Sequence, residues 1–306
     1  MPFSFVCPHC HLKSLVEDRY AGQTGPCAGC GKQITLPARK DAIADPVLPQ
    51  GKGTRPSLLP TQALVIRLLV SVSLLAFIGG GVAFFSMPII RKAAAFRNRN
   101  ACLQNMQQIV TALNSYALKY GSYPPPVVVD STGAPLYSWR VLILPELGYQ
   151  SVYDAIDKSQ PWNSITNNQA IQMMPEVFAS PGSVDAFALK ESNYVYLIGP
   201  GTLFPKSGPI PKASIGDSLD QTILLTETTN SMCWTQPGDS IDVSNGIQFG
   251  TRASTDLGGN HEGFANVVTV SGIAMSLPST ISPALLDALI SANGREEVDT
   301  SSLVSP

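Results

Sequence analysis

Residues 68–90 constrain this chain more than any other stretch, because 23 consecutive residues there carry no charged side chain. As an α-helix, which rises about 1.5 Å per residue, the stretch would span about 35 Å. That length is enough to cross the hydrocarbon core of a bilayer. We therefore predict a transmembrane helix over residues 64–90, with a buried core helix as the alternative. A signal peptide is not expected, because the stretch begins well inside the chain.

The charged residues are distributed unevenly along the chain. The net charge is −2, yet residues 1–100 hold 12 Lys and Arg against 4 Asp and Glu, whereas residues 101–306 hold 8 against 18. Charged residues make up only 14% of the chain, compared with about a quarter of an average soluble domain. This pattern excludes a uniformly basic nucleic-acid-binding protein and indicates that the two parts occupy different environments.

Four of the six cysteines form two Cys-x-x-Cys pairs near the N-terminus, with 16 residues between the pairs. They are Cys7, Cys10, Cys27 and Cys30. This spacing is typical of a structural Zn²⁺ site with four thiolate ligands. A segment of about forty residues is too small for an adequate core, so the ion would supply folding free energy. We predict a zinc-binding module over residues 1–38, with two disulfides or a redox pair as alternatives.

The segment between the two predicted elements, residues 39–63, is rich in Pro and Gly and is predicted to be a flexible linker.

Two arguments about membrane orientation disagree. The basic residues next to the apolar stretch slightly favour a cytoplasmic C-terminal side. A four-thiolate zinc site, in contrast, persists most easily in a reducing cytosol. We give the zinc site more weight and expect a cytoplasmic N-terminus and an extracytoplasmic C-terminal domain.

Helical periodicity continues beyond the apolar stretch. Apolar side chains recur every three or four residues at Leu103, Met106, Val110, Leu113, Ala117 and Tyr120. Such a stripe predicts that the helix extends over residues 91–121 and packs one face on another element. Gly121 and the prolines at 124–126 supply signals that end the helix.

The remainder is predicted to be β-rich over residues 122–278. Short apolar runs at 193–197, 222–225, 266–270 and 273–277 are separated by Gly, Pro, Ser, Asn and Asp. Ser271 and Gly272 join the last two runs as a hairpin turn. Ser282 and Pro283 then begin a terminal helix, so residues 279–306 form that helix and a polar tail. The fold class is therefore α+β, with a long helix packed on an antiparallel sheet.

Several short motifs follow one another in order between residues 97 and 299. They lie at Cys102–Met106, Tyr120–Pro125, Ser138–Leu142, Pro161–Ser164, Gly199–Thr202, Gly259–His261 and Ala288–Ile290. Their order resembles a large bacterial pilin-like family of unknown function, abundant in planctomycetes and associated with prepilin-type processing. That family is marked by a His followed, nine residues later, by Asp-Gly. The resemblance implies a type II secretion pseudopilin-like domain, and residues 1–38 separately resemble small zinc ribbons.

The chain departs from this family in its processing signal and in a cysteine. No prepilin peptidase signal precedes Leu68, so cleavage and pilus-style assembly are not expected. The family's Cys-Pro-Ser stands here as Ala179, Ser180 and Pro181, which rules out a bridge from Cys102 to that position. Cys233 is then the remaining partner within the resemblance. A Cys102–Cys233 disulfide and two buried free thiols are the two hypotheses.

The chain also departs from the family's Asp-Gly motif. Ser271 and Gly272 occupy that position, nine residues after His261. The turn residue is small and polar but not acidic, so we interpret His261, Ser271 and Gly272 as a structural hairpin motif rather than a catalytic or metal site.

No catalytic motif is complete. His261 begins an HExxH-like sequence, but Ala265 stands where the second histidine belongs. A triad or metal site could be assembled on paper from Asp256, Glu227 and His261 with Ser254 or Ser271. Because such sets arise by chance, we expect no enzymatic activity, and structural Zn²⁺ as the cofactor with no small-molecule cofactor.

Two functional hypotheses follow. In the first, the chain is a single-pass membrane protein with an extracytoplasmic pilin-like structural or recognition domain and a cytoplasmic zinc module. In the second, it is a transmembrane coupling or sensor protein whose zinc ribbon binds a protein or nucleic acid. The expected partners are the lipid bilayer and a protein, including a second copy, because Ala76 and Gly80 have the four-residue spacing of associating membrane helices. Nucleic acid is the less favoured partner, because no aromatic residues alternate with the basic ones.

Overall fold

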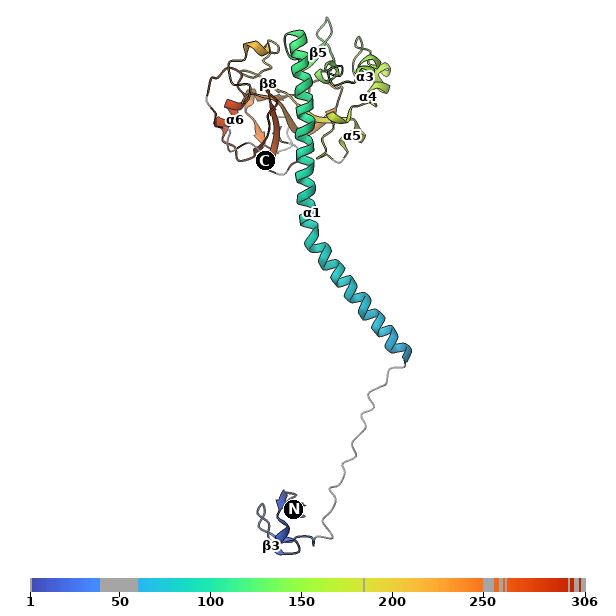
Figure 1. The fold of residues 1–306 in the computed structure, drawn as a ribbon, viewed down its shortest axis with the longest axis vertical. Helices are drawn as coiled ribbons and strands as arrows, with labels where there is room; N and C mark the ends of the chain where they lie inside the picture. Colours follow the sequence, from blue (N-terminus) through green and yellow to red (C-terminus); the bar gives the residue numbers. More distant parts are fainter. Residues whose placement is uncertain are drawn as a thin grey trace. The chain divides into compact units, whose positions relative to one another are not determined.

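The computed structural model describes residues 2–38, 60–183, 185–249, 256–258, 261, 263–296, 298–299 and 303. The chain divides into two compact units, Met1–Gly79 and Gly80–Pro306, each described by itself below. Figure 1 shows the ribbon and the element labels. Of the predicted linker, residues 39–59 lie outside the described part, and residues 60–63 belong to a helix.

The N-terminal module consists of two antiparallel hairpins and a short 3₁₀ turn, η1 (Asp18–Tyr20). Strand β1 (Phe3–Val6) pairs with β2 (Lys13–Val16), and β3 (Thr24–Pro26) pairs with β4 (Gln33–Thr35). Cys7 and Cys27 are the only buried residues within 2–38. The module therefore has no hydrophobic core within those residues.

Helix α1 (Pro60–Tyr120) is continuous over 61 residues. By length and composition it is able to cross a membrane. No described side chain between residues 64 and 97 is buried. From Cys102 onward a stripe is buried, and it comprises Cys102, Leu103, Met106, Ile109, Val110, Ala112, Leu113 and Ala117. The predicted stripe is thus confirmed, except that Tyr120 is exposed because the buried contacts end at Ala117.

A four-stranded antiparallel sheet of order β14-β13-β9-β7 forms the centre of the second unit. Its strands are β7 (Glu191–Val195), β9 (Ile223–Cys233), β13 (Phe264–Thr269) and β14 (Ala274–Pro278). The predicted hairpin between the last two strands is confirmed. Gly272 in its turn has φ of 96°, a left-handed conformation that favours glycine.

Shorter elements surround this sheet. The remaining strands are β5 (Val127–Val129), β6 (Pro135–Ser138), β8 (Leu197–Ile198), β10 (Ile241–Asp242), β11 (Gln248–Phe249) and β12 (Asp256–Leu257). The remaining helices are α2 (Trp139–Leu142), α3 (Gln150–Ala155), α4 (Asn168–Ile171), α5 (Ala186–Leu189) and α6 (Pro283–Ile290), with 3₁₀ turns at Ile165–Asn167, Glu176–Phe178, Lys212–Ser214 and Val243–Asn245.

Ser282 caps α6 as predicted, since its side chain accepts the Leu285 N–H.

The sheet is covered on both faces. Because side chains alternate along a strand, Tyr194 and Tyr196 join the cluster that contains the α1 stripe, whereas Val195 and Leu197 join the cluster that contains α6. Figure 1 shows α1 running alongside the sheet. This arrangement places polar residues that sit between α1 and the sheet out of contact with water.

A buried ion pair lies in the α1-side part of the domain. The Arg140 guanidinium bonds to the Asp239 carboxylate and to the Tyr194 carbonyl, and its Nη1 donates to Ser138 Oγ at 2.9 Å. The side chains of Arg140 and Asp239 are 0% and 1% exposed. A charge in this position is stable only with its partner.

Candidate functional site

The four N-terminal cysteines lie together, as the sequence predicts. The Sγ atoms of Cys7 and Cys30 are 3.9 Å apart, those of Cys10 and Cys27 are 3.8 Å apart, and all four lie within 4.8 Å of one another. Thiolates around a tetrahedral Zn²⁺ with bonds of about 2.3 Å are separated by about 3.8 Å. The cluster can therefore hold a metal ion.

Each Cys-x-x-Cys pair sits in a hairpin turn of the same form. His11 N donates to Cys7 O at 2.9 Å, and Gly31 N donates to Cys27 O at 2.8 Å. The N–H groups of His9 and Gly29 point at the sulfurs of Cys7 and Cys27, each at 3.4 Å. Amide donors aimed at sulfur favour the thiolate, and the Gly29 and Cys30 amides lower the pKa of Cys27.

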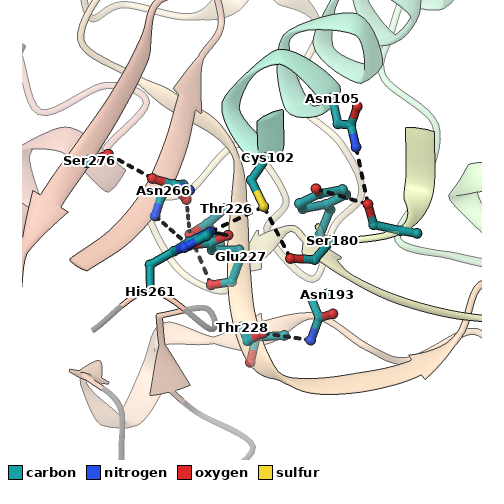
Figure 2. A network of polar contacts seen from close by, with 12 residues as sticks. Cys102, Asn105, Ser180, Asn193, Thr226, Glu227, Thr228, His261, Asn266 and Ser276 are labelled. Carbon is teal, nitrogen blue, oxygen red and sulfur yellow. Dashed lines mark hydrogen bonds and ion pairs between the residues drawn. The ribbon is translucent and has the colours of Figure 1, made fainter. Parts of the chain in front are cut away.

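A second polar cluster lies inside the α+β domain (Figure 2). Cys102 comes from α1, Glu227 from β9, and His261 from the segment before β13. Cys102 and Glu227 are fully buried and His261 is 9% exposed. His261 Nε2 lies 3.2 Å from Cys102 Sγ and 3.6 Å from Glu227 Oε2. Three chemically active groups from distant parts of the chain thus meet at one point.

Neighbouring groups hold this cluster in place. Glu227 Oε1 accepts the Asn266 N–H at 3.0 Å, and Ser276 Oγ donates to Asn266 Oδ1 at 2.7 Å. On the opposite side, Cys102 Sγ lies 3.2 Å from Ser180 Oγ. Glu227 Oε2 has no hydrogen-bond partner among the described residues. Oε2 is therefore buried next to the other two groups without a hydrogen bond of its own, while the backbone and side chain of Asn266 both interact with the carboxyl group.

Burial favours the neutral form of each group in this cluster. It raises the pKa of Glu227 to about 8 and, together with the charge of Arg99, lowers the pKa of His261 to about 4. Burial and the nearby Glu227 also raise the pKa of the Cys102 thiol. At neutral pH the metal-free cluster consequently holds a carboxylic acid, a neutral imidazole and a thiol, rather than a His–Glu ion pair.

The disulfide hypothesis is not met by the structure, in which Cys102 and Cys233 are both free thiols. Cys102 contacts His261 and Ser180, whereas Cys233 Sγ lies 3.4 Å from Thr235 Oγ1. The two sulfurs have different neighbours, because Cys102 lies in the core and Cys233 is at the half-buried end of β9.

The predicted hairpin motif is divided between two places. Ser271 and Gly272 lie in the β13–β14 turn, where Gln107 Nε2 of α1 donates to Gly272 O at 3.0 Å. His261 lies at the other end of β13, in contact with Cys102 and Glu227. Of the other residues considered for a triad, Ser254 lies outside the described part of the chain.

From the sequence, Glu227 and His261 were grouped only as one set that could arise by chance, and Cys102 was not predicted to lie near them. One signal was available. Glu227 is a carboxylate within a run of small and apolar residues that reads as a buried strand, and β9 is buried from Ile223 to Thr228. An acid at such a position needs a specific partner.

Comparison with known proteins places the second unit in a family. Residues 92–256 match the family described as "Protein of unknown function (DUF1559)". The match includes Cys102 and Glu227. No curated protein and no solved structure matches the chain. Because the match covers more than half of the 306 residues, the chain belongs to the DUF1559 family of proteins of unknown function.

Proposed function

We propose that this chain is a non-enzymatic, single-pass membrane protein. In this proposal the DUF1559 domain is an extracytoplasmic structural or recognition module of pilin-like design, and the four-cysteine module binds Zn²⁺ in the cytoplasm. The observation that carries the proposal is that one uninterrupted helix, α1, has an exposed apolar first part and a buried stripe in its second part.

The exposed first part of α1 requires an apolar environment. Phe77, Phe84 and Phe85 are 81%, 76% and 74% exposed, and most of their neighbours between residues 64 and 90 are also large and apolar. Soluble proteins do not leave so long an apolar surface in water. A lipid bilayer matches both the length and the composition of this segment.

The second part of α1 supports the pilin-like design. Met106, Val110 and Leu113 of the same helix pack in the core with the antiparallel sheet. A single helix that both anchors in lipid and completes a β-rich domain fixes the domain at the membrane surface. This suits a module that presents a surface to other proteins, including further copies.

The four-cysteine cluster supports zinc and the proposed orientation. Four thiolates at tetrahedral spacing are the ligands that Zn²⁺ prefers. The module has no core within residues 2–38 other than Cys7 and Cys27, so the ion would hold its two hairpins together. Such thiolates remain reduced in the cytosol.

Membrane orientation is the test of this proposal. Reporter cysteines are introduced one at a time at Leu15→Cys and Thr132→Cys, both at exposed positions, and cells are treated with a membrane-impermeant maleimide. We expect Thr132→Cys to be labelled in intact cells and Leu15→Cys only after permeabilisation, above the labelling of the unmodified chain. The reverse pattern would overturn the orientation, and recovery of the chain in the soluble fraction would overturn the membrane anchor.

A further inference from the structure

We propose that Cys102, Glu227 and His261 form a second metal site, which takes a divalent transition ion of the Zn²⁺ type inside the α+β domain. The site is separate from the four N-terminal cysteines. It joins α1 to the central sheet, and it does not depend on the orientation proposed above.

The distances between the three groups are close to those of a coordination site. Zn²⁺ bonds of about 2.3 Å to sulfur and about 2.0–2.1 Å to nitrogen or oxygen place tetrahedral ligand atoms about 3.3–3.6 Å apart. In the structure, Cys102 Sγ and His261 Nε2 are 3.2 Å apart, and His261 Nε2 and Glu227 Oε2 are 3.6 Å apart. All three atoms lie within 4.8 Å of one another.

The unpartnered oxygen of Glu227 is an independent sign of a ligand. Oε2 is fully buried and accepts no hydrogen bond from the described residues, while Oε1 of the same group is satisfied by Asn266. Leaving a buried carboxyl oxygen unpaired is costly. A cation between Oε2, Nε2 and Sγ would satisfy this oxygen.

A hydrogen-bonded Glu–His pair accounts less well for the geometry. The 3.6 Å between Nε2 and Oε2 exceeds the range of an N–H···O bond. Nε2 also lies 3.2 Å from the Cys102 sulfur, so one nitrogen is close to both a sulfur and a carboxyl oxygen. Convergence of sulfur, nitrogen and oxygen on one point is typical of a metal ligand set.

The ligand types select the class of ion. Thiolate and imidazole favour Zn²⁺ and similar transition ions over Mg²⁺ and Ca²⁺, which prefer oxygen ligands. Ser180 Oγ lies 3.2 Å from Cys102 Sγ, on the side of the sulfur opposite the cluster, and so holds the sulfur in place. Because Cys102 and Glu227 are fully buried, the ion would cross-link α1 and β9 rather than act on a substrate.

The test measures metal content in the full-length chain in detergent. Cys7, Cys10, Cys27 and Cys30 are all replaced by Ser, so that the N-terminal cluster no longer contributes. We expect this quadruple variant to retain one Zn²⁺ per chain after dialysis. Loaded with Co²⁺, it should show the thiolate-to-cobalt charge-transfer absorption of Cys102.

Two further substitutions in that background locate the ion. Glu227→Gln, which keeps the size of the side chain, should weaken Zn²⁺ binding at least about tenfold, because a direct ligand is lost. Cys233→Ser is the matched control, since Cys233 is a half-buried cysteine of the same domain that lies outside the cluster. It should leave both the Zn²⁺ content and the cobalt absorption unchanged.

The proposal is overturned if the quadruple variant folds, as judged by near-ultraviolet circular dichroism, and binds no Zn²⁺ when the ion is supplied. It is also overturned if Glu227→Gln binds Zn²⁺ as tightly as its parent. Loss of the cobalt absorption in Cys233→Ser would show that Cys233, and not Cys102, supplies the thiolate ligand. That result would equally overturn the site. The test does not replace Cys102 itself, because this fully buried residue could be needed for folding.

Discussion

Cys102 Sγ and Ser180 Oγ face each other across the core at 3.2 Å, although the two residues are 78 positions apart in the chain. Ser180 lies immediately after the 3₁₀ turn Glu176–Phe178 and Ala179, and it is 2% exposed. This contact ties α1 to a segment outside the central sheet.

We therefore predict that Ser180→Cys forms a disulfide with Cys102. Only a small movement separates a 3.2 Å contact from a bond of about 2 Å. Closing so long a loop should raise the free energy of unfolding by about 2–4 kcal/mol. Intact mass after mild oxidation checks the bond, and Ser180→Ala is the control without a thiol. If Cys102 still reacts fully with a thiol reagent in the oxidised variant, the prediction fails.

The buried Glu227 and His261 predict a particular pH dependence of the metal-free domain. The folded carboxyl keeps its proton up to about pH 8 while the unfolded one loses it near 4.5, so stability falls as the pH rises over this range. His261 acts in the opposite direction between about pH 4 and 6.5, because the unfolded imidazole binds a proton there and the folded one does not.

The two effects oppose each other below pH 6.5, and Glu227 acts alone above it. We expect the free energy of unfolding to fall by at most about 2 kcal/mol between pH 6.5 and 8 in the presence of a chelator. Urea denaturation followed by the fluorescence of buried Trp139 and Trp234 measures it. Glu227→Gln should remove the slope, and an unchanged slope in that variant would contradict the assignment.

Equivalent turn positions in the N-terminal module predict opposite substitution effects. His11 and Gly31 stand four residues after Cys7 and Cys27, with φ of 57° and 68°. An Ala in the left-handed region costs about 1 kcal/mol. Since folding and metal binding are coupled here, Gly31→Ala should weaken Zn²⁺ affinity about fivefold.

The converse change, His11→Gly, should strengthen Zn²⁺ affinity by relieving the same conformational cost. Competition with a chelator of known affinity measures both variants in the full chain. Gly25→Ala is the matched control, because an added Cβ there meets nothing within 4 Å and the φ of Gly25 is not positive. Weaker binding in Gly25→Ala than in Gly31→Ala would refute the interpretation.

The buried ion pair predicts a large loss of stability on removal of one partner. Arg140→Met leaves the Asp239 carboxylate buried without its cation and should destabilise the domain by about 3–5 kcal/mol. Thermal unfolding followed by circular dichroism measures this loss. Adding Asp239→Asn should recover part of it, and a double variant no more stable than the single one would count against the pairing.

Local patterns in the sequence predicted much of this fold. Spacing alone placed the four N-terminal cysteines together, since each pair lies within one turn. Periodicity identified the α1 stripe from Leu103 to Ala117. Ser282 signalled the start of α6 because capping depends on neighbours a few residues away. All of these features arise from interactions over short stretches of chain.

The second cluster could not be predicted in the same way. Cys102, Glu227 and His261 meet only because β9 pairs with β13 in one register, with an irregularity between Val268 and Thr269. A shift by one residue would turn Glu227 to the opposite face of the sheet. The burial of Arg140 likewise depends on Asp239, which lies 99 positions away. Long-range register of this kind leaves no local mark in the sequence.

Under the membrane anchor proposed above, the dual use of α1 determines where the domain could be released from the bilayer. A peptide-bond cut between residues 91 and 97, where no described side chain is buried, would set free a water-soluble domain that keeps its central helix. A cut about three turns later, beyond Met106, would remove part of the core that packs on the sheet. The cleavage position that would release a folded domain and the one that would unfold it are therefore only about ten residues apart on one helix.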